Sequence, residues 1–119
     1  MYEIKVKSGF AAAHNLRHYS GKCERLHGHN WGVEAVFRYR SLGRDGMAVD
    51  FREAKKALGR AIEQFDHSYL NDLDDFKRLN PTSENTARAI FDRIRKENAR
   101  IYSVAVWENE SSCATYSRP

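Results

Sequence analysis

The sequence has few cysteines and no long apolar segment. Two cysteines, Cys23 and Cys113, occur among 119 residues. They are too few for a disulfide framework, and a cytoplasmic protein would keep both thiols reduced. The longest apolar stretches span a handful of residues, the mean hydropathy is −0.73, and the first residues alternate between apolar and charged types. We therefore expect a cytoplasmic protein with neither a membrane span nor a secretory signal.

The surplus of positive charge is small. Twenty Lys and Arg residues oppose 16 Asp and Glu residues, which gives a net charge of +4. Such a surplus suits nucleic acid, a phosphorylated small molecule or merely a soluble surface. The length fits a single domain over residues 1–119, and no repeat or linker interrupts it. Because a domain of this size has a thin core, self-association would stabilise it.

Alternation of apolar and polar residues predicts four strands, two toward each end of the chain. The first two cover residues 2–14 and 30–40, and the last two cover residues 101–108 and 113–117. Two helical segments separate the pairs, so the order is strand, strand, helix, helix, strand, strand. This order predicts an α+β fold with a mainly antiparallel sheet.

Each predicted helix begins at a capping residue. Asp50 is placed to cap the first helix with Glu53 as its capping-box partner, and Thr82 or Ser83 is placed to cap the second. Apolar residues at helical spacing predict one buried face on each helix. These residues are Phe51, Ala54, Ala57, Leu58, Ala61, Ile62 and Phe65 in the first segment, and Ala87, Ile90, Phe91 and Ile94 in the second.

The densest chemical signal lies at residues 23–30. His27 and His29 are two residues apart, so in an extended backbone both rings leave the same face. Gly28 between them lets the backbone bend. His14, on the apolar face of the neighbouring strand, is the natural third ligand. Three histidines with an open fourth position are typical of a catalytic zinc site.

Cys23 has two interpretations that its spacing does not separate. As a fourth zinc ligand it would make the site structural and the protein a noncatalytic zinc module. As a thiol whose pKa the cation lowers, it would act as a base or a nucleophile. A nucleic-acid binder is a third class, but the aromatic residues share the face of the predicted core rather than a basic surface. We therefore favour an enzyme that acts on a small molecule.

The Asp66-His67 pair also has two interpretations. A carboxylate beside an imidazole can orient the ring for an acid/base relay, whereas a histidine after a helix can simply interact with the helix dipole. We expect His18 and Glu110 to lie at the surface and Cys113 to be a small buried residue.

Glu108 is placed at the end of a strand face that points inward. It shares parity with Tyr102, Val104 and Val106. A buried carboxylate needs partners, and a ligand with paired N–H donors, such as a guanidine-like edge, would supply them. The alternative is a strand end that is already in water.

Several motifs together resemble one known family over nearly the whole chain. They are FAAAH at 10–14, CERLHGHN at 23–30, GMAVDF at 46–51, DH at 66–67 with LN at 70–71, NPTSEN at 80–85, and Glu108 before Cys113 and Tyr116. This collinear set resembles the 6-pyruvoyltetrahydropterin synthase / 6-carboxytetrahydropterin synthase family.

The resemblance implies a tunnelling fold with a four-stranded antiparallel sheet, two helices on one face and the order ββααββ. It also implies a homohexamer of two stacked trimers with active sites at the subunit interfaces. The implied roles are zinc ligands for His14, His27 and His29, general base for Cys23, proton relay for Asp66 and His67, pterin anchor for Glu108, and pterin pocket for Thr82 and Ser83.

The spacing Cys23-x3-His27-x-His29 resembles the bacterial carboxytetrahydropterin synthases of the queuosine pathway. This resemblance implies zinc-dependent conversion of 7,8-dihydroneopterin triphosphate to 6-carboxy-5,6,7,8-tetrahydropterin, with release of acetaldehyde and triphosphate. Pyruvoyl-type chemistry on the same substrate is an alternative.

Glu24 departs from that pattern. It resembles the Glu of a variant subgroup that cleaves the side chain to 6-hydroxymethyldihydropterin for folate. We hypothesise that Cys23 directs carboxytetrahydropterin formation while Glu24 permits some folate-type cleavage.

Overall fold

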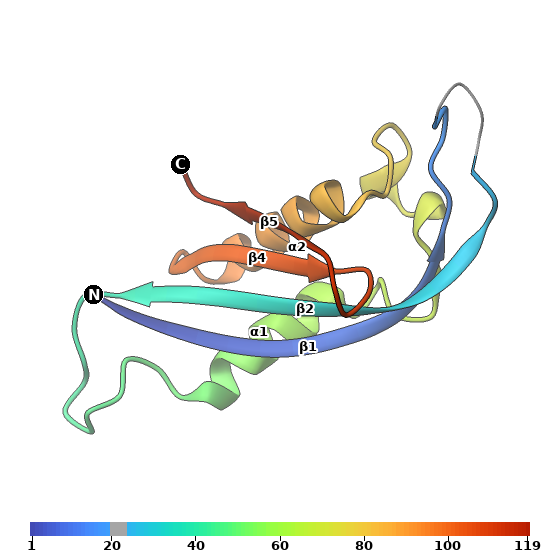
Figure 1. The fold of residues 1–119 in the computed structure, drawn as a ribbon. Helices are drawn as coiled ribbons and strands as arrows, with labels where there is room; N and C mark the ends of the chain where they lie inside the picture. The colour runs from blue at the N-terminus through green and yellow to red at the C-terminus, as the bar shows by residue number, and fades with distance from the viewer. Residues whose placement is uncertain (20–23) are drawn as a thin grey trace.

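Two long strands form the central hairpin of the fold (Figure 1). A computed structural model describes residues 1–19 and 24–119. Its elements are β1 (Tyr2–His14), β2 (His27–Tyr39), α1 (Phe51–Ile62), β3 (Ser68–Tyr69), the 3₁₀ turns η1 (Leu70–Asp72) and η2 (Asp74–Phe76), α2 (Ser83–Glu97), β4 (Ile101–Trp107) and β5 (Cys113–Ser117). The four long strands and both helices lie close to where the periodicity predicts them.

The sheet has five strands in the order β3-β1-β2-β4-β5. The expected four-stranded sheet is therefore corrected: β3 is a two-residue strand that pairs parallel with β1 at Ala12 and Ala13. Two residues are too few to show alternation in a sequence. The other pairings, β1 with β2, β2 with β4 and β4 with β5, are antiparallel as predicted.

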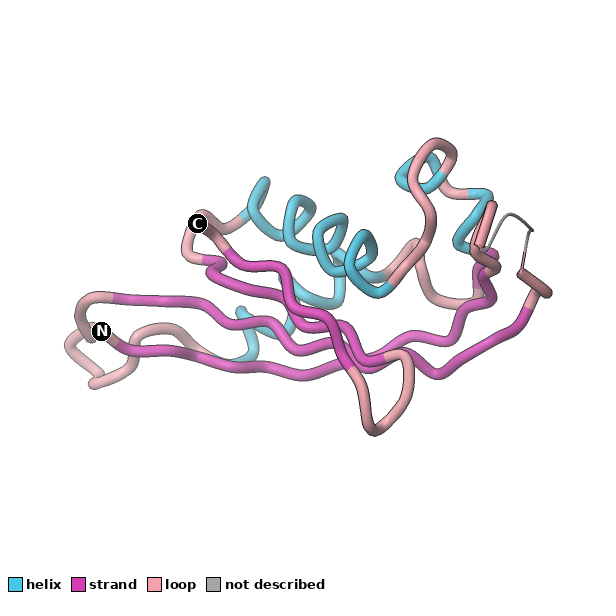
Figure 2. The backbone as a smooth tube through the Cα atoms, turned by 45° about the horizontal axis from the view of Figure 1, so that its top comes forward, coloured by secondary structure: helices cyan, strands magenta, loops and turns pink. Residues whose placement is uncertain are grey.

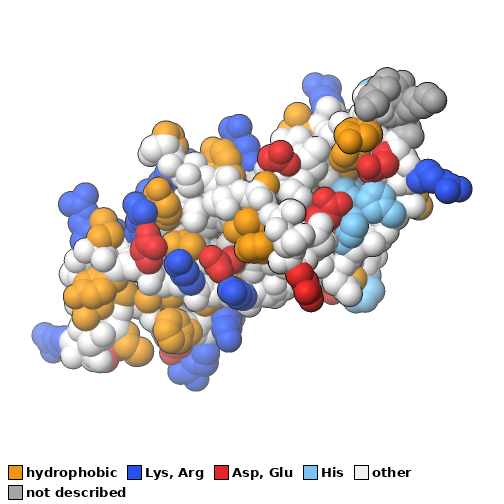
Figure 3. All heavy atoms as spheres, viewed as in Figure 1, with side chains coloured by type: hydrophobic (Ala, Val, Ile, Leu, Met, Phe, Trp, Pro, Cys, Tyr) orange, Lys and Arg blue, Asp and Glu red, His pale blue; other side chains and the backbone are white. Residues whose placement is uncertain are grey.

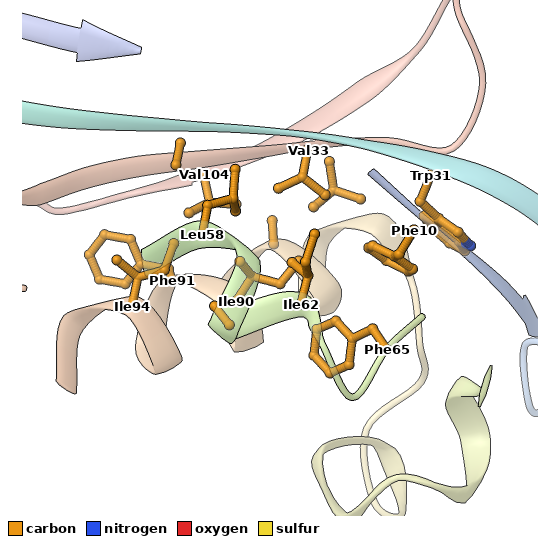
Figure 4. Packing of buried hydrophobic residues seen from close by; sticks show 14 of the residues in the cluster. Phe10, Trp31, Val33, Leu58, Ile62, Phe65, Ile90, Phe91, Ile94 and Val104 are labelled. Atoms are coloured by element: carbon orange, nitrogen blue, oxygen red, sulfur yellow. The ribbon is translucent and has the colours of Figure 1, made fainter. Parts of the chain in front are cut away.

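Both helices cover one face of the sheet (Figure 2). Side chains from the helices and the inner face of the strands form the core between the two layers (Figure 4). Phe10 stacks on Trp31 with ring centroids 5.8 Å apart and contacts Phe65 edge-on at 5.6 Å. This aromatic cluster lies toward the end of the hairpin that carries the histidines. Trp31 therefore contacts both the core and the candidate site.

The first turn of α1 differs from its prediction in two respects. Asp50 is the N-cap as predicted, and its carboxylate accepts a hydrogen bond from the backbone N–H of Arg52. The first difference is Glu53, whose carboxylate lies 3.8 Å from Nζ of Lys56 rather than in a capping box. Phe51 is 60% exposed, although it falls on the periodic apolar face. The face buried by α1 starts one turn later, at Ala54.

A β-bulge changes which residues of β4 face the core. Val36 pairs with Ser103 and Phe37 with Ile101, so Tyr102 has no partner in the ladder. Ile101 is fully buried, whereas Tyr102 lies half-buried beneath the guanidinium of Arg38, 3.3 Å from its ring centroid. The expected inward position of Tyr102 is wrong.

The inward positions of Val104 and Val106 are confirmed, since both are buried. His18 and Glu110 are exposed as predicted. Cys113 is also exposed, which corrects its expected burial: it lies on the outermost strand of the sheet. Among the helices of residues 1–19 and 24–119, none is both long and apolar enough to span a membrane.

Two phenylalanines allow a direct test of this packing. Phe65 is fully buried between Phe10 and Phe76, and Phe65→Ala should lower the free energy of unfolding by about 3–5 kcal/mol. The control Phe51→Ala removes an exposed ring and should change it by no more than about 0.5 kcal/mol. Urea unfolding of both variants measures the difference; equal losses would contradict the assigned faces of α1 and its C-terminal extension.

Candidate metal centre and active site

Three histidines meet at one end of the β1–β2 hairpin. The strand register places His14 opposite His27 and Ala12 opposite His29, so the three imidazoles leave the same face. The Nε2 atoms of His14 and His27 are 3.0 Å apart, and the ring centroid of His29 is 5.4 Å from that of His14 and 4.7 Å from that of His27. Histidine and acidic side chains gather at this end of the surface (Figure 3). The predicted convergence of the three histidines is confirmed.

Glu108 joins this cluster from the turn after β4. Its Oε1 lies 2.8 Å from Nε2 of His29, 3.2 Å from Nε2 of His14 and 3.7 Å from Nε2 of His27. One donor atom from each of the four residues falls within 4.8 Å of all the others. Sequence parity predicts an inward carboxylate, but its approach to the histidines depends on the pairing of β2 with β4, which the sequence does not reveal.

Backbone carbonyls orient two of the imidazoles. Nδ1 of His14 lies 2.8 Å from the carbonyl oxygen of Pro81, and Nδ1 of His27 lies 2.9 Å from that of Arg25. Because a carbonyl only accepts hydrogen bonds, both rings must donate from Nδ1. The Nε2 lone pairs therefore face the cluster, which is the arrangement found when an outer partner orients a metal-ligating histidine.

His29 is the ring whose inner nitrogen remains unsatisfied. Its Nε2 is buried and has no hydrogen-bond partner within the described part of the chain, since Glu108 is near but outside hydrogen-bond geometry. Removal from water is the main cause that lowers the pKa of His29, and His27 and His14 lower it further, while Glu108 opposes the shift. The neutral imidazole is the form that binds a metal. The orphaned nitrogen and the His/carboxylate donor set fit a zinc ion.

Two asparagines hold the chain that follows His14. The side-chain amide of Asn71 accepts from the N–H of Asn15 (3.0 Å) and donates to its carbonyl (2.8 Å). Asn80 makes the same pair of bonds with Arg17, at 2.8 and 2.9 Å. Each amide thus replaces the partner that a neighbouring strand would supply. Both asparagines lie in the motifs that carry the family resemblance, yet nothing in the sequence indicates which backbone they bind.

Asp66 and His67 form the predicted carboxylate–imidazole pair, but on the edge of β1. Oδ1 of Asp66 accepts from the N–H of Ala11 at 2.9 Å, and its Oδ2 lies 3.1 Å from Nδ1 of His67. The bond from Ala11 is the main cause that lowers the pKa of Asp66, and His67 adds to the effect. Since α1 ends at Ile62, His67 lies beyond the last turn of that helix.

The ring of His67 is not part of the group formed by the three histidines and Glu108, and it is largely exposed. Its backbone N–H donates to Ala11 at 2.6 Å, and its φ of 57° is left-handed. A hollow of about 410 Å³, lined in part by Ala13, His29 and His67, reaches from the metal-site candidate toward this pair. The histidine cluster and the Asp66–His67 pair therefore border the same surface hollow.

The remaining predicted residues lie around the cluster, except Cys23, which is outside the described residues. Oε1 of Glu24 accepts from the N–H of Leu16 at 3.4 Å and lies 3.7 Å from Nδ1 of His27. Thr82 is the N-cap of α2, where its hydroxyl accepts from Asn85 at 3.1 Å, and Ser83 begins the helix. Both follow Pro81, which brings the start of α2 next to His14.

Comparison with known proteins supports the interpretation of this site. A family model described as 6-pyruvoyl tetrahydropterin synthase matches residues 3–119. The chain belongs to this family. A Synechocystis protein described as 6-carboxy-5,6,7,8-tetrahydropterin synthase is 37% identical over 125 residues, covering 100% of this chain and 95% of that protein. A Pyrococcus furiosus protein described as dihydroneopterin monophosphate aldolase is 32% identical over 108 residues, covering 88% of each.

A solved structure gives the same result for the fold. The structure of Caenorhabditis elegans 6-pyruvoyl tetrahydropterin synthase matches with a TM-score of 0.88 at 27% identity, covering 99% of this chain and 96% of that one. The α+β fold with two helices, the family resemblance and the expectation of an enzyme are confirmed.

Single substitutions test the metal centre. His14→Ala, His27→Ala and His29→Ala should each weaken zinc binding by more than about 100-fold, because loss of an outer partner alone costs about 10–100-fold. The control is His18→Ala, which removes an exposed ring from the segment after β1 and should leave the affinity unchanged. Competition with a chromogenic zinc chelator measures all four. Equal zinc affinity in the control and the cluster variants would refute the site.

Proposed function

We propose that this protein converts 7,8-dihydroneopterin triphosphate to 6-carboxy-5,6,7,8-tetrahydropterin and releases acetaldehyde and triphosphate. The observation that carries the proposal is the cluster of three inward-facing imidazoles, one with an orphaned buried Nε2. This cluster occurs in a chain 37% identical to a protein described as a 6-carboxy-5,6,7,8-tetrahydropterin synthase. The net charge of +4 suits the triphosphate.

The proposed mechanism divides the work among few side chains. A zinc ion held by His14, His27 and His29 would supply Lewis acidity to the oxygens of the substrate side chain. Cys23, as a thiolate, removes a proton from the activated carbon. His67, oriented by the Asp66 carboxylate at 3.1 Å, returns a proton.

Substrate binding is assigned to residues beside the cluster. The carboxylate of Glu108 accepts paired N–H donors from the guanidine-like edge of the pterin. Thr82 and Ser83, at the start of α2, line the pterin pocket. Because Thr82 follows the carbonyl that orients His14, the pocket and the metal ligands are held by the same segment.

We propose a cytoplasmic homohexamer of two stacked trimers with active sites at subunit interfaces. Support comes from the exposure of the functional groups of one chain: the His67 ring of the Asp66–His67 pair is 83% exposed, and the hollow that it lines together with His29 lies at the surface, where a second copy can cover it. A neighbouring copy can bring a second such pair to the cluster. Pairing of exposed sheet edges between copies would also remove a surface prone to aggregation.

A second activity is favoured by the position of Glu24. Its carboxylate lies 3.7 Å from His27, and the chain is 32% identical to a protein described as dihydroneopterin monophosphate aldolase. We propose that Glu24 permits some cleavage to 6-hydroxymethyldihydropterin. Pyruvoyl-type chemistry remains an alternative through the likeness to the C. elegans structure.

Product analysis tests the main activity. The zinc-loaded protein is incubated with 7,8-dihydroneopterin triphosphate, and the products are identified by mass. We expect 6-carboxy-5,6,7,8-tetrahydropterin with acetaldehyde and triphosphate, and no turnover by Cys23→Ala. A dominant pyruvoyl product would replace the proposal with its alternative. A zinc–sulfur shell in the X-ray absorption spectrum would instead indicate that Cys23 closes a structural site.

The same assay tests Glu24. Glu24→Ala should abolish the 6-hydroxymethyl product and leave the carboxytetrahydropterin product, because the thiol base remains. Glu110→Ala, which alters an exposed carboxylate, serves as the control and should change neither. If the hydroxymethyl product of Glu24→Ala persists unchanged, the role of Glu24 is wrong.

A further inference from the structure

Glu108 has two partners competing for one carboxylate. In the proposed function it accepts N–H donors from the pterin, yet in the structure its Oε1 faces the Nε2 atoms of all three histidines. Its side chain is 32% exposed, so part of it already contacts water. Contact with the histidines and binding of the pterin would both use Oε1 of Glu108.

The four donor atoms are close enough to one another to hold a single ion. With zinc–ligand bonds of 2.0–2.1 Å, neighbouring ligand atoms of a tetrahedron lie about 3.3–3.4 Å apart. Oε1 of Glu108 lies 2.8, 3.2 and 3.7 Å from the three Nε2 atoms, and the Nε2 atoms of His14 and His27 are 3.0 Å apart. These four separations lie within about 0.6 Å of that value, so Oε1 is close enough to the three nitrogens to share one ion with them.

Hydrogen bonds fix the backbone on both sides of Glu108. Trp107 is the last residue of β4 and pairs with Gly32 of β2. Asn109, on the other side, accepts hydrogen bonds at Oδ1 from the N–H groups of Ser111 and Ser112, at 2.9 and 3.0 Å. Rotation of the Glu108 side chain is therefore the smallest movement that takes the carboxylate away from the histidines.

We propose that Glu108 is the fourth zinc ligand in the absence of substrate and that binding of the pterin ring removes it from the metal. The inference rests on the proposed function. A guanidine-like edge donates two parallel N–H bonds and needs both carboxylate oxygens turned toward it, so the carboxylate has to rotate away from the metal to bind the pterin. The exchange makes and breaks no bond within the substrate. It turns a closed site of four protein ligands into an open site of three. The fourth position opens only when a pterin ring is bound.

Cobalt substitution makes the exchange visible. The probe is unsubstituted pterin, which carries the guanidine-like edge but no side-chain oxygens, added to the Co²⁺-loaded protein. We expect pterin to change the visible ligand-field spectrum of the wild type to one close to that of Glu108→Ala. Glu108→Gln and Glu108→Ala should bind zinc at least about 10-fold more weakly, and their spectra should not respond to pterin. Glu110→Ala, in the same turn, should behave as the wild type.

Each outcome decides the matter. Equal zinc affinity and an equal cobalt spectrum in wild type and Glu108→Ala would overturn the assignment of Glu108 as a ligand. A wild-type spectrum that pterin leaves unchanged, at concentrations where pterin binds by fluorescence, would overturn the exchange. Neither result bears on whether the wild type forms carboxytetrahydropterin, so failure of the proposed function would be seen separately. Circular dichroism of Glu108→Gln, Glu108→Ala and Glu110→Ala tests whether each variant is folded.

Discussion

The register of the β1–β2 hairpin is the constraint on which the site depends. Its ladder runs from Tyr2 opposite Tyr39 to His14 opposite His27, without interruption. A slip of one residue would move every side chain of one strand to the other face of the sheet. His27 and His29 would then leave the core side while His14 stayed on it. The apolar residues of the same strands, such as Phe10 and Trp31, oppose such a slip because it would expose them.

Trp31 links the stability of the core to the chemistry of the site. Its ring contacts those of His14 and His29 at centroid distances of 4.8 and 5.5 Å, and its indole N–H donates to the carbonyl of Ala12 at 3.2 Å. The tryptophan is 1% exposed, so His14 and His29 pack against an aromatic ring that water does not reach. Such packing disfavours the imidazolium form, and removal from water is the main cause of the lowered pKa of His29. The packing that stabilises the hairpin thus also favours the neutral form of His29, the form that a metal would require.

Period-two alternation predicts the strands, and the apolar parity of each strand predicts that His14, His27 and His29 point to the same side of the sheet. The register that brings the three rings together comes from the pairing of β1 with β2. Where prediction failed, the cause lay outside the local pattern. The β-bulge turns Tyr102 out of the core, and Phe51 is exposed at the first position of α1, before the buried face of the helix begins at Ala54. A two-residue strand such as β3 has no period to detect.

Residues that act through long-range hydrogen bonds were also beyond prediction. Asn71 binds backbone groups at Asn15, 56 positions earlier in the chain, and a polar side chain carries no sign of such a partner. Glu108 was predicted to face inward, but its approach to the histidines arises from the pairing of two strands far apart in sequence.

The choice of partners around the histidines sets the charge of the site. His14 and His27 donate to the carbonyls of Pro81 and Arg25 rather than to carboxylates. A carbonyl orients the ring and adds no negative charge. With zinc in place, three neutral imidazoles and the Glu108 carboxylate would leave one net positive charge on the closed centre. Release of Glu108 to the pterin would restore the full divalent charge at the moment when the side-chain oxygens of an anionic substrate arrive. Because the carboxylate is the single acidic group in this donor set, its proposed release would raise the net positive charge of the centre and so strengthen the polarisation of the substrate.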